Sequence, residues 1–205
     1  MEDTTQLKSD FELNPNLWIS WYTRDDVNFV YIPVHRCATN WMIDLLTHNG
    51  FYEILPSERD AFHNKERLVI IREPTERVLS GMFVPSEEID LSVLDSNIDK
   101  LEFERKLSND VHTSNQTKYL SKNDNGKYIY FKFGSDLPDK IYDYMNSQGV
   151  VLESGPMNWT TTAVGAESRE RREKVFSDPK LLNMFREFLK EDYELYNSVE
   201  FYGTN

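Results

Sequence analysis

Short apolar runs that each lead into an amphipathic helical segment constrain the fold of this chain more than any other feature. The run Asn28 to Ile32 precedes Asn40 to His48, where apolar residues recur at helical spacing. Arg67 to Ile71 is a second such run, and Pro74 suits the first turn of a helix over Thr75 to Phe83. Two strand–helix units in succession favour an α/β fold with parallel strands.

The same alternation continues through the rest of the 205 residues. The pattern predicts further strands at Leu17 to Tyr22, Tyr128 to Phe133 and Val150 to Glu153, and further helices at Pro138 to Met145 and after Asp178. Residues 86–110 are expected to form an acidic, partly helical insertion that contributes Ile98, Leu101 and Leu107 to the core. These elements predict a single domain over residues 1–205, with a mainly parallel β-sheet flanked by helices and a ligand site beyond the carboxyl ends of the strands.

The charge balance and the cysteine count limit the functions open to the chain. A formal net charge of −12 argues against general nucleic-acid binding, which requires a basic surface. The single cysteine, Cys37, excludes an intrachain disulfide. The first residues have no basic or apolar export segment, and no apolar run is long enough for a membrane span. We therefore expect a cytoplasmic protein, and its size favours a microbial or viral source.

The loop after the first apolar run carries the residues of an anion-binding site. It reads His35-Arg36-Cys37-Ala38-Thr39-Asn40-Trp41 and connects a strand that stops at Pro33 to a helix. The N–H groups of a helix N-terminus, the helix dipole and the Arg36 guanidinium all favour negative charge at one place. The loop therefore predicts a phosphate or sulfate site, with an ordinary strand–loop–helix connection as the alternative.

A second anion site is predicted at Arg72 and Ser80. Arg72 follows the second apolar run, and Ser80 lies further along the helix after it. Because neighbouring parallel strands end at the same edge of a sheet, Arg72 should point into the same crevice as the loop. A guanidinium together with a hydroxyl suits a phosphate dianion. Arg77, close to Glu73 and Glu76, is interpreted as a solvated ion-pair member.

Together these motifs resemble those of the sulfotransferases that use 3′-phosphoadenylyl sulfate. The segment Arg36 to Trp41 is similar to their 5′-phosphosulfate loop, Lys-Ser-Gly-Thr-Thr-Trp in cytosolic members, and its end is similar to the Thr-Asn-Trp of carbohydrate sulfotransferases. Arg72-x-Pro74-x-x-Arg77-x-x-Ser80 matches the family motif whose first arginine and serine hold the 3′-phosphate. His112 to Gln116 is similar to a His-x-x-Pro-Gln signature of carbohydrate-type members, without its proline, and Phe131 to Leu137 resembles the strand that follows it.

The resemblance, which covers residues 29–137, implies a P-loop-NTPase-like sulfotransferase fold and a matching activity. The enzyme would transfer a sulfuryl group from 3′-phosphoadenylyl sulfate to a hydroxyl of a carbohydrate or small metabolite and release 3′-phosphoadenosine 5′-phosphate, without a metal. The loop residues His35 to Trp41, with Arg72 and Ser80, would bind the nucleotide. Where the family has lysine in the loop, this chain offers Arg36 or His35, and Arg36 is favoured because it is always charged.

The acceptor hydroxyl requires a general base, which is a histidine or glutamate in much of this family. His63 lies just before the second strand, where cytosolic-type members carry their catalytic histidine, and His112 lies in the carbohydrate-type signature. Both remain candidates, with Glu53 and Glu58 as further ones.

The sequence also allows two other functions, and it allows two interpretations of one charged segment. A P-loop nucleotide kinase would share the fold class, although the chain lacks Gly-x-x-x-x-Gly-Lys-Ser/Thr. A non-catalytic nucleotide- or glycan-binding module would explain the missing loop lysine. The run Ser168 to Lys174 reads either as a solvated helix face or as a basic lid over the nucleotide. The oligomeric state is left open.

Overall fold

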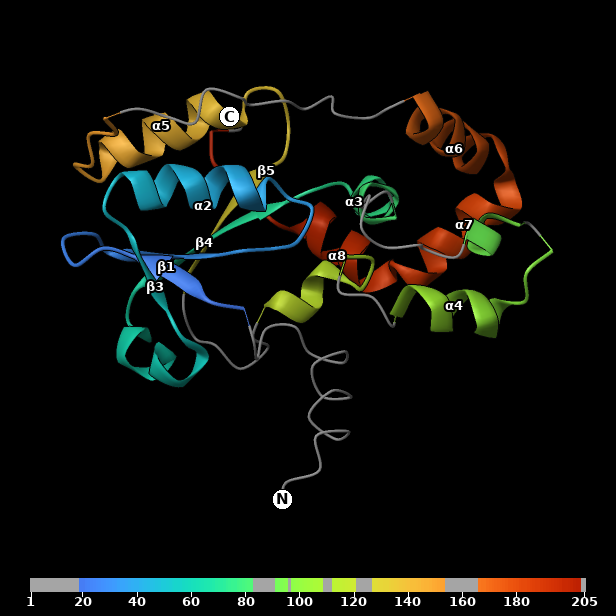
Figure 1. Cartoon of the computed structure of the whole chain (residues 1–205), viewed down its shortest axis with the longest axis horizontal. Helices are drawn as coiled ribbons and strands as arrows, with labels where there is room; N and C mark the ends of the chain where they lie inside the picture. The colour runs from blue at the N-terminus through green and yellow to red at the C-terminus, as the bar shows by residue number, and fades with distance from the viewer. Residues whose placement is uncertain are drawn as a thin grey trace, which may run out of the picture.

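The computed structural model describes residues 19–82, 91–95, 97–108, 112–120, 127–153 and 166–203. In these residues one five-stranded sheet is packed against helices (Figure 1). The strands are β1 (Trp21–Thr23), β2 (Phe29–Ile32), β3 (Tyr52–Ile54), β4 (Glu66–Ile71) and β5 (Tyr128–Lys132). The α-helices are α2 (Thr39–His48), α3 (Pro74–Gly81), α4 (Lys100–Ser108), α5 (Leu137–Ser147), α6 (Ala166–Ser177), α7 (Pro179–Phe188) and α8 (Lys190–Ser198). Short 3₁₀ helices are η2 (Pro56–Phe62), η3 (Leu91–Leu94) and η4 (Gln116–Tyr119).

The sheet has the strand order β3-β1-β2-β4-β5 and is mixed. The pairs β2–β4 and β4–β5 are parallel, whereas β1 is antiparallel to both β2 and β3. The prediction of the α/β fold class is confirmed, but the prediction of a mainly parallel sheet is wrong. The chain between β1 and β2 is a short turn, and a parallel pair would need a crossover connection of a dozen residues or more.

The predicted elements with long apolar runs agree with the structure to within about two residues at their described ends. The central strands β2 and β4 are almost wholly buried, as expected for strands covered on both faces. Helix α7 begins where predicted, because the Asp178 carboxylate accepts the N–H groups of Lys180 and Leu181. Residues 17, 18, 83 and 86–90 fall outside the described part.

Three local predictions are wrong or incomplete. Val150 to Glu153 is irregular rather than a strand, and Val151 is 78% exposed. Leu101 is 77% exposed, because α4 turns Phe103 and Leu107 toward the core instead. Strand β3 was not predicted, since two of its three residues are exposed and leave no apolar alternation to detect.

Two hydrophobic clusters form the core. The larger lies between the sheet and helices α2 and α5, which cover one face of the sheet (Figure 1). The smaller joins α3 to η3, α4, α6 and α7, which lie together to the right of α3 in Figure 1. Helix α3 directly follows the central strand β4, so its N-terminus lies beside the ends of β2 and β4. Its later residues lead into the second cluster.

Candidate functional site

The loop between β2 and α2 has an unusual backbone. Arg36 has φ 67° and Ala38 has φ 61°, and no other non-glycine residue in the described ranges has a positive φ. The left-handed region costs an L-residue about 1–2 kcal/mol, so surrounding contacts must hold this loop in place. Alternation of right- and left-handed residues gathers successive N–H groups into an anion-binding concavity.

Two hydrogen bonds inside the loop hold the Val34 carbonyl group in place. The Val34 carbonyl accepts the Cys37 N–H at 3.1 Å and the Thr39 hydroxyl at 2.7 Å. Ala38 is the N-cap of α2, and its methyl group cannot accept a hydrogen bond from the first turn of the helix. The positive end of the α2 dipole therefore meets the loop without an N-cap side chain.

Arg36 connects the two motifs that the sequence analysis singled out. Its guanidinium donates a hydrogen bond to the Ser80 carbonyl at 2.7 Å, so the end of α3 lies against the β2–α2 loop. Ser80 is half-buried in the last turn of α3. The loop cation and the predicted phosphate-binding serine are therefore neighbours.

Arg72 lies directly after β4, at the sheet edge where the loop begins. Its guanidinium stacks over the Phe133 ring at 4.5 Å and lies 3.6 Å from the Glu76 carboxylate. Burial lowers the pKa of Arg72 and raises the pKa of Glu76. A guanidinium remains charged at neutral pH. Glu76 also pairs with Arg172 of α6. One member of the basic run thus contacts the site, which a purely solvated helix face would not do.

The two histidines His35 and His112 lie beside the loop. Their rings meet edge to face with centroids 5.0 Å apart, and the His35 ring also lies 5.7 Å from that of Tyr119. Burial, followed by the neighbouring His112, Arg77 and Arg36, lowers the pKa of His35 to about 4. His35 is therefore neutral at pH 7, which leaves Arg36 as the source of positive charge in the loop.

The structure does not bring His63 to the loop. His63 precedes β4, whereas the loop follows the carboxyl end of the parallel strand β2. Six residues of β4 span about 20 Å, so His63 and the loop lie at opposite ends of the parallel strands. The exposed His63 ring contacts the Asp60 carbonyl at 2.8 Å. Glu53 lies on edge strand β3, two strands from β2, and Glu58 accepts the Leu55 N–H at 2.9 Å.

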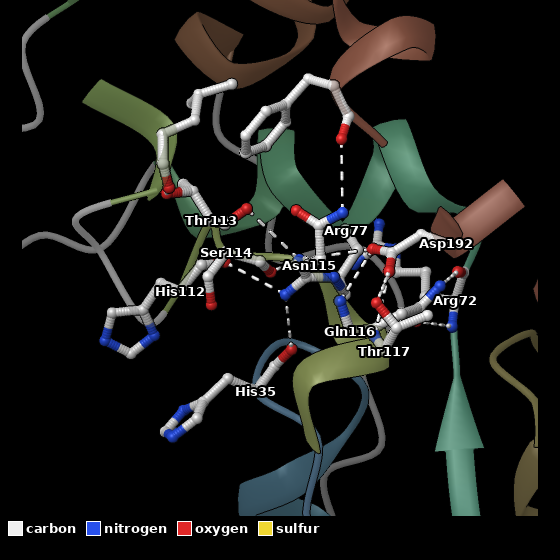
Figure 2. Close-up of polar contacts among 12 residues, drawn as sticks. His35, Arg72, Arg77, His112, Thr113, Ser114, Asn115, Gln116, Thr117 and Asp192 are labelled. Carbon is white, nitrogen blue, oxygen red and sulfur yellow. Dashed lines mark hydrogen bonds and ion pairs between the residues drawn. The ribbon is translucent and has the colours of Figure 1, made fainter. Parts of the chain in front are cut away.

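The interpretation of Arg77 as a solvated ion-pair member is wrong. Arg77 is fully buried, and its guanidinium donates to the carbonyls of His35 at 3.5 Å, His112 at 3.4 Å, Thr113 at 3.4 Å and also Ser114 (Figure 2). The buried Asp192 of α8 lies 4.0 Å from the same guanidinium. Asp192 was not singled out in the sequence, because a carboxylate in a strongly charged helix gives no signal of burial.

The remaining loop residues differ in exposure. Cys37 is fully buried, and burial raises the pKa of its thiol to about 11, so it is protonated at neutral pH and not activated as a nucleophile. Thr39 and Trp41 are half-buried, and Asn40 is exposed at the start of α2. The residues that the structure describes contain no group of three or more His, Cys, Asp or Glu side chains arranged to hold a metal ion.

No family model matches this chain, and no curated protein or solved structure is similar to it at a significant level. The chemistry of the site therefore has to be argued from its own residues. Of the helices that the structure describes, none combines the length and apolar character required to cross a membrane.

Proposed function

We propose that the chain is a sulfotransferase that uses 3′-phosphoadenylyl sulfate and has a P-loop-type sulfotransferase fold. The observation that carries this proposal is the contact between Arg36 and Ser80, which joins the β2–α2 loop to the Arg72–Ser80 motif. A donor with a 5′-phosphosulfate and a separate 3′-phosphate needs two anion sites in one crevice, one at each motif.

The residues fit such a donor in charge and in backbone geometry. The left-handed residues Arg36 and Ala38 and the uncapped start of α2 suit a phosphosulfate group. Arg72, whose side chain is 14% exposed, and Ser80 would hold the 3′-phosphate. Arg72 also faces Glu76, so a phosphate would compete with a carboxylate that is already there.

The donor supplies an activated sulfuryl group whose bond to the 5′-phosphate breaks as the acceptor oxygen forms its bond to sulfur. Arg36 and the N–H groups at the start of α2 stabilise the negative charge that develops on the leaving phosphate. His112 accepts the proton that the acceptor hydroxyl loses, and it is preferred to His63 because it lies beside the loop. Arg72 and Ser80 bind far from the reacting atoms and fix orientation.

The acceptor in this proposal is a neutral carbohydrate or a small hydroxylated metabolite, and the location is the cytoplasm. A net charge of −12 disfavours long polyanionic glycans as acceptors.

Calorimetry and a transfer assay test the proposal. The full chain should bind 3′-phosphoadenosine 5′-phosphate without Mg²⁺ and more tightly than ATP, because the two anion sites match its two phosphates. A preference for Mg-ATP would instead identify a phosphotransferase and overturn the proposal. Transfer of labelled sulfate to any member of a panel of sugars and small alcohols should be detected, and binding without any transfer would identify a non-catalytic module.

A further inference from the structure

The buried pair Arg77 and Asp192 links the β2–α2 loop, residues 112–117 and, through Gln116, Arg72. Neither residue belongs to the predicted ligand set. Arg77 extends from the middle of α3 to the β2–α2 loop and to residues 112–114. Asp192 extends from α8 to residues 116 and 117. Figure 2 shows both side chains at the centre of this network, with His35 and His112 at its edge.

The contact from Arg77 to His35 controls the direction of a loop N–H group. In a trans peptide the carbonyl of one residue and the N–H of the next point in opposite directions. Because the His35 carbonyl turns toward Arg77, the N–H of Arg36 must point to the other side of the loop. The Val34 carbonyl is held in the same way by Cys37 and Thr39. Arg77 therefore helps to keep the strained loop in its anion-binding form.

The same guanidinium also holds the candidate base. It contacts the carbonyls of His112, Thr113 and Ser114, and this fixes the main chain from which the His112 ring projects. Gly81 on α3 packs directly against His112, because a Cβ at Gly81 would lie 2.2 Å from the His112 carbonyl oxygen. The position of His112 is therefore set from α3.

Asp192 acts on the other anion site through Gln116. Its carboxylate accepts the N–H groups of Gln116 at 2.8 Å and Thr117 at 2.9 Å, and the Thr117 hydroxyl at 3.0 Å. The Gln116 side chain in turn binds the main chain of Arg72, accepting its N–H at 3.4 Å and donating to its carbonyl at 3.1 Å. The chain of contacts thus runs from α8 to the arginine of the second motif.

We propose that Arg77 and Asp192 are positioning residues, which hold the loop, His112 and Arg72 in one geometry without touching a ligand. This inference rests on the proposed function for the identity of the ligand, but the geometry that it describes can be tested separately. A general contribution to stability is the competing explanation, since any buried arginine bonded to carbonyls helps to hold a fold together.

Arg67 provides a matched control for that explanation. It is also fully buried, and its guanidinium donates to the carbonyls of Phe62 and His63 at 3.1 and 3.2 Å, and to that of Lys65. It lies near the start of β4, at the edge of the sheet opposite the loop. Arg67→Lys and Arg77→Lys therefore each remove a buried guanidinium that donates to main-chain carbonyls, one far from the loop and one beside it.

Hydrogen exchange of the full-length variants decides between local positioning and general stability. Arg77→Lys should raise the exchange rate of residues 35–41 and 112–117 by about tenfold or more, while β2 and β4 stay protected. Arg67→Lys should leave both segments unchanged. Equal exchange of these segments in the two variants would overturn the inference, whether or not the protein binds the proposed nucleotide.

Ligand binding and turnover supply the second readout. Asp192→Asn should weaken binding of 3′-phosphoadenosine 5′-phosphate about tenfold, because it acts through Arg72. Arg77→Lys should lower kcat about 100-fold and change the donor KM much less, because it acts through the loop and His112. Arg67→Lys should keep the affinity, kcat and KM of the wild type. A similar loss of affinity and of kcat in all three variants would contradict the inference. If the wild-type chain does not bind this nucleotide, the proposed function fails and the exchange experiment still decides on positioning.

Discussion

The carboxylate of Glu76 lies 3.6 Å from the guanidinium of Arg72, so the arginine proposed to bind a phosphate already faces a negative charge. A phosphate dianion at Arg72 would be repelled by Glu76. We expect Glu76→Gln to bind 3′-phosphoadenosine 5′-phosphate about threefold to tenfold more tightly than the wild type at neutral pH. Calorimetry measures this directly.

Glu102→Gln is a suitable control for Glu76→Gln, because Glu102 pairs with Arg105 at 2.8 Å on the solvent-facing side of α4. The affinity of Glu102→Gln for 3′-phosphoadenosine 5′-phosphate should equal that of the wild type. Weaker binding by Glu76→Gln would mean that the carboxylate orients Arg72 rather than competing for it.

Substitution of the two arginines should separate chemistry from binding. Arg36→Ala should lower kcat by roughly 100- to 1000-fold with a moderate loss of affinity, because in the proposed reaction Arg36 meets charge that develops only in the transition state. Arg72→Ala should chiefly weaken nucleotide binding, by about 10- to 100-fold. Steady-state kinetics and calorimetry distinguish the two effects. Wild-type rates and affinities in both variants would show that the crevice has been assigned incorrectly.

His35 should make the folded state sensitive to acid. Its pKa is about 4 in the folded protein, against an ordinary value of 6.5, so between these values the unfolded chain binds a proton that the folded protein does not. The free energy of unfolding should therefore fall as the pH drops from 6.5 to 4, with a contribution from His35 of up to about 3 kcal/mol.

Urea denaturation at pH 7 and at pH 4.5 measures this contribution by comparison with His35→Gln. The difference in unfolding free energy between the two pH values should be smaller in the variant, because the proton uptake of the unfolded state is lost. His48→Gln, at the exposed end of α2, is the control. An identical pH dependence in wild type and His35→Gln would rule out a buried, neutral His35.

Gly81→Ala should destabilise the protein and disturb His112. A Cβ at this position would lie 2.2 Å from the His112 carbonyl oxygen, and a main-chain atom cannot easily move away. Overpacking against a main-chain atom costs about 3 kcal/mol and the gain in helix propensity is about 1 kcal/mol, so we expect a net loss of about 2 kcal/mol in unfolding free energy.

Gly134→Ala provides the comparison for Gly81→Ala. Its Cβ would lie 3.0 Å from a carboxylate oxygen of Asp136, a side chain that can rotate away. Denaturant titration should show little change for Gly134→Ala. Equal stability of the two variants would contradict the close packing of α3 against His112.

The sequence predicted an element correctly where a single local property, such as an apolar run or a capping residue, determines that element. Buried central strands need continuous apolar runs, so β2 and β4 were predictable, and Asp178 and Pro179 marked the start of α7. The side chains of Arg36, Arg72 and Ser80 could be assigned to one edge of the sheet because parallel strands end together. Strand β3 has no such property, because its exposed residues depend on pairing with β1.

The buried polar network could not be predicted for a different physical reason. Glu73 and Glu76 flank Arg77 in the sequence, a pattern typical of an exposed helix face, yet the groups that bind Arg77 are main-chain carbonyls from the β2–α2 loop and from residues 112–114. Every residue has a main-chain carbonyl, so the sequence does not indicate which of these groups an arginine will contact. His63 was misleading for a related reason, since closeness to β4 along the chain does not say which end of the strand a side chain occupies.

Helix α8 gives the site a particular place in the order of synthesis. Every candidate ligand residue precedes α8 in the chain, yet the Asp192 carboxylate on this helix holds residues 116 and 117 in position. On the ribosome, β2, β4 and β5 are all synthesised before α8. The candidate site therefore cannot reach its final geometry until α8 has been synthesised and has docked against residues 116 and 117.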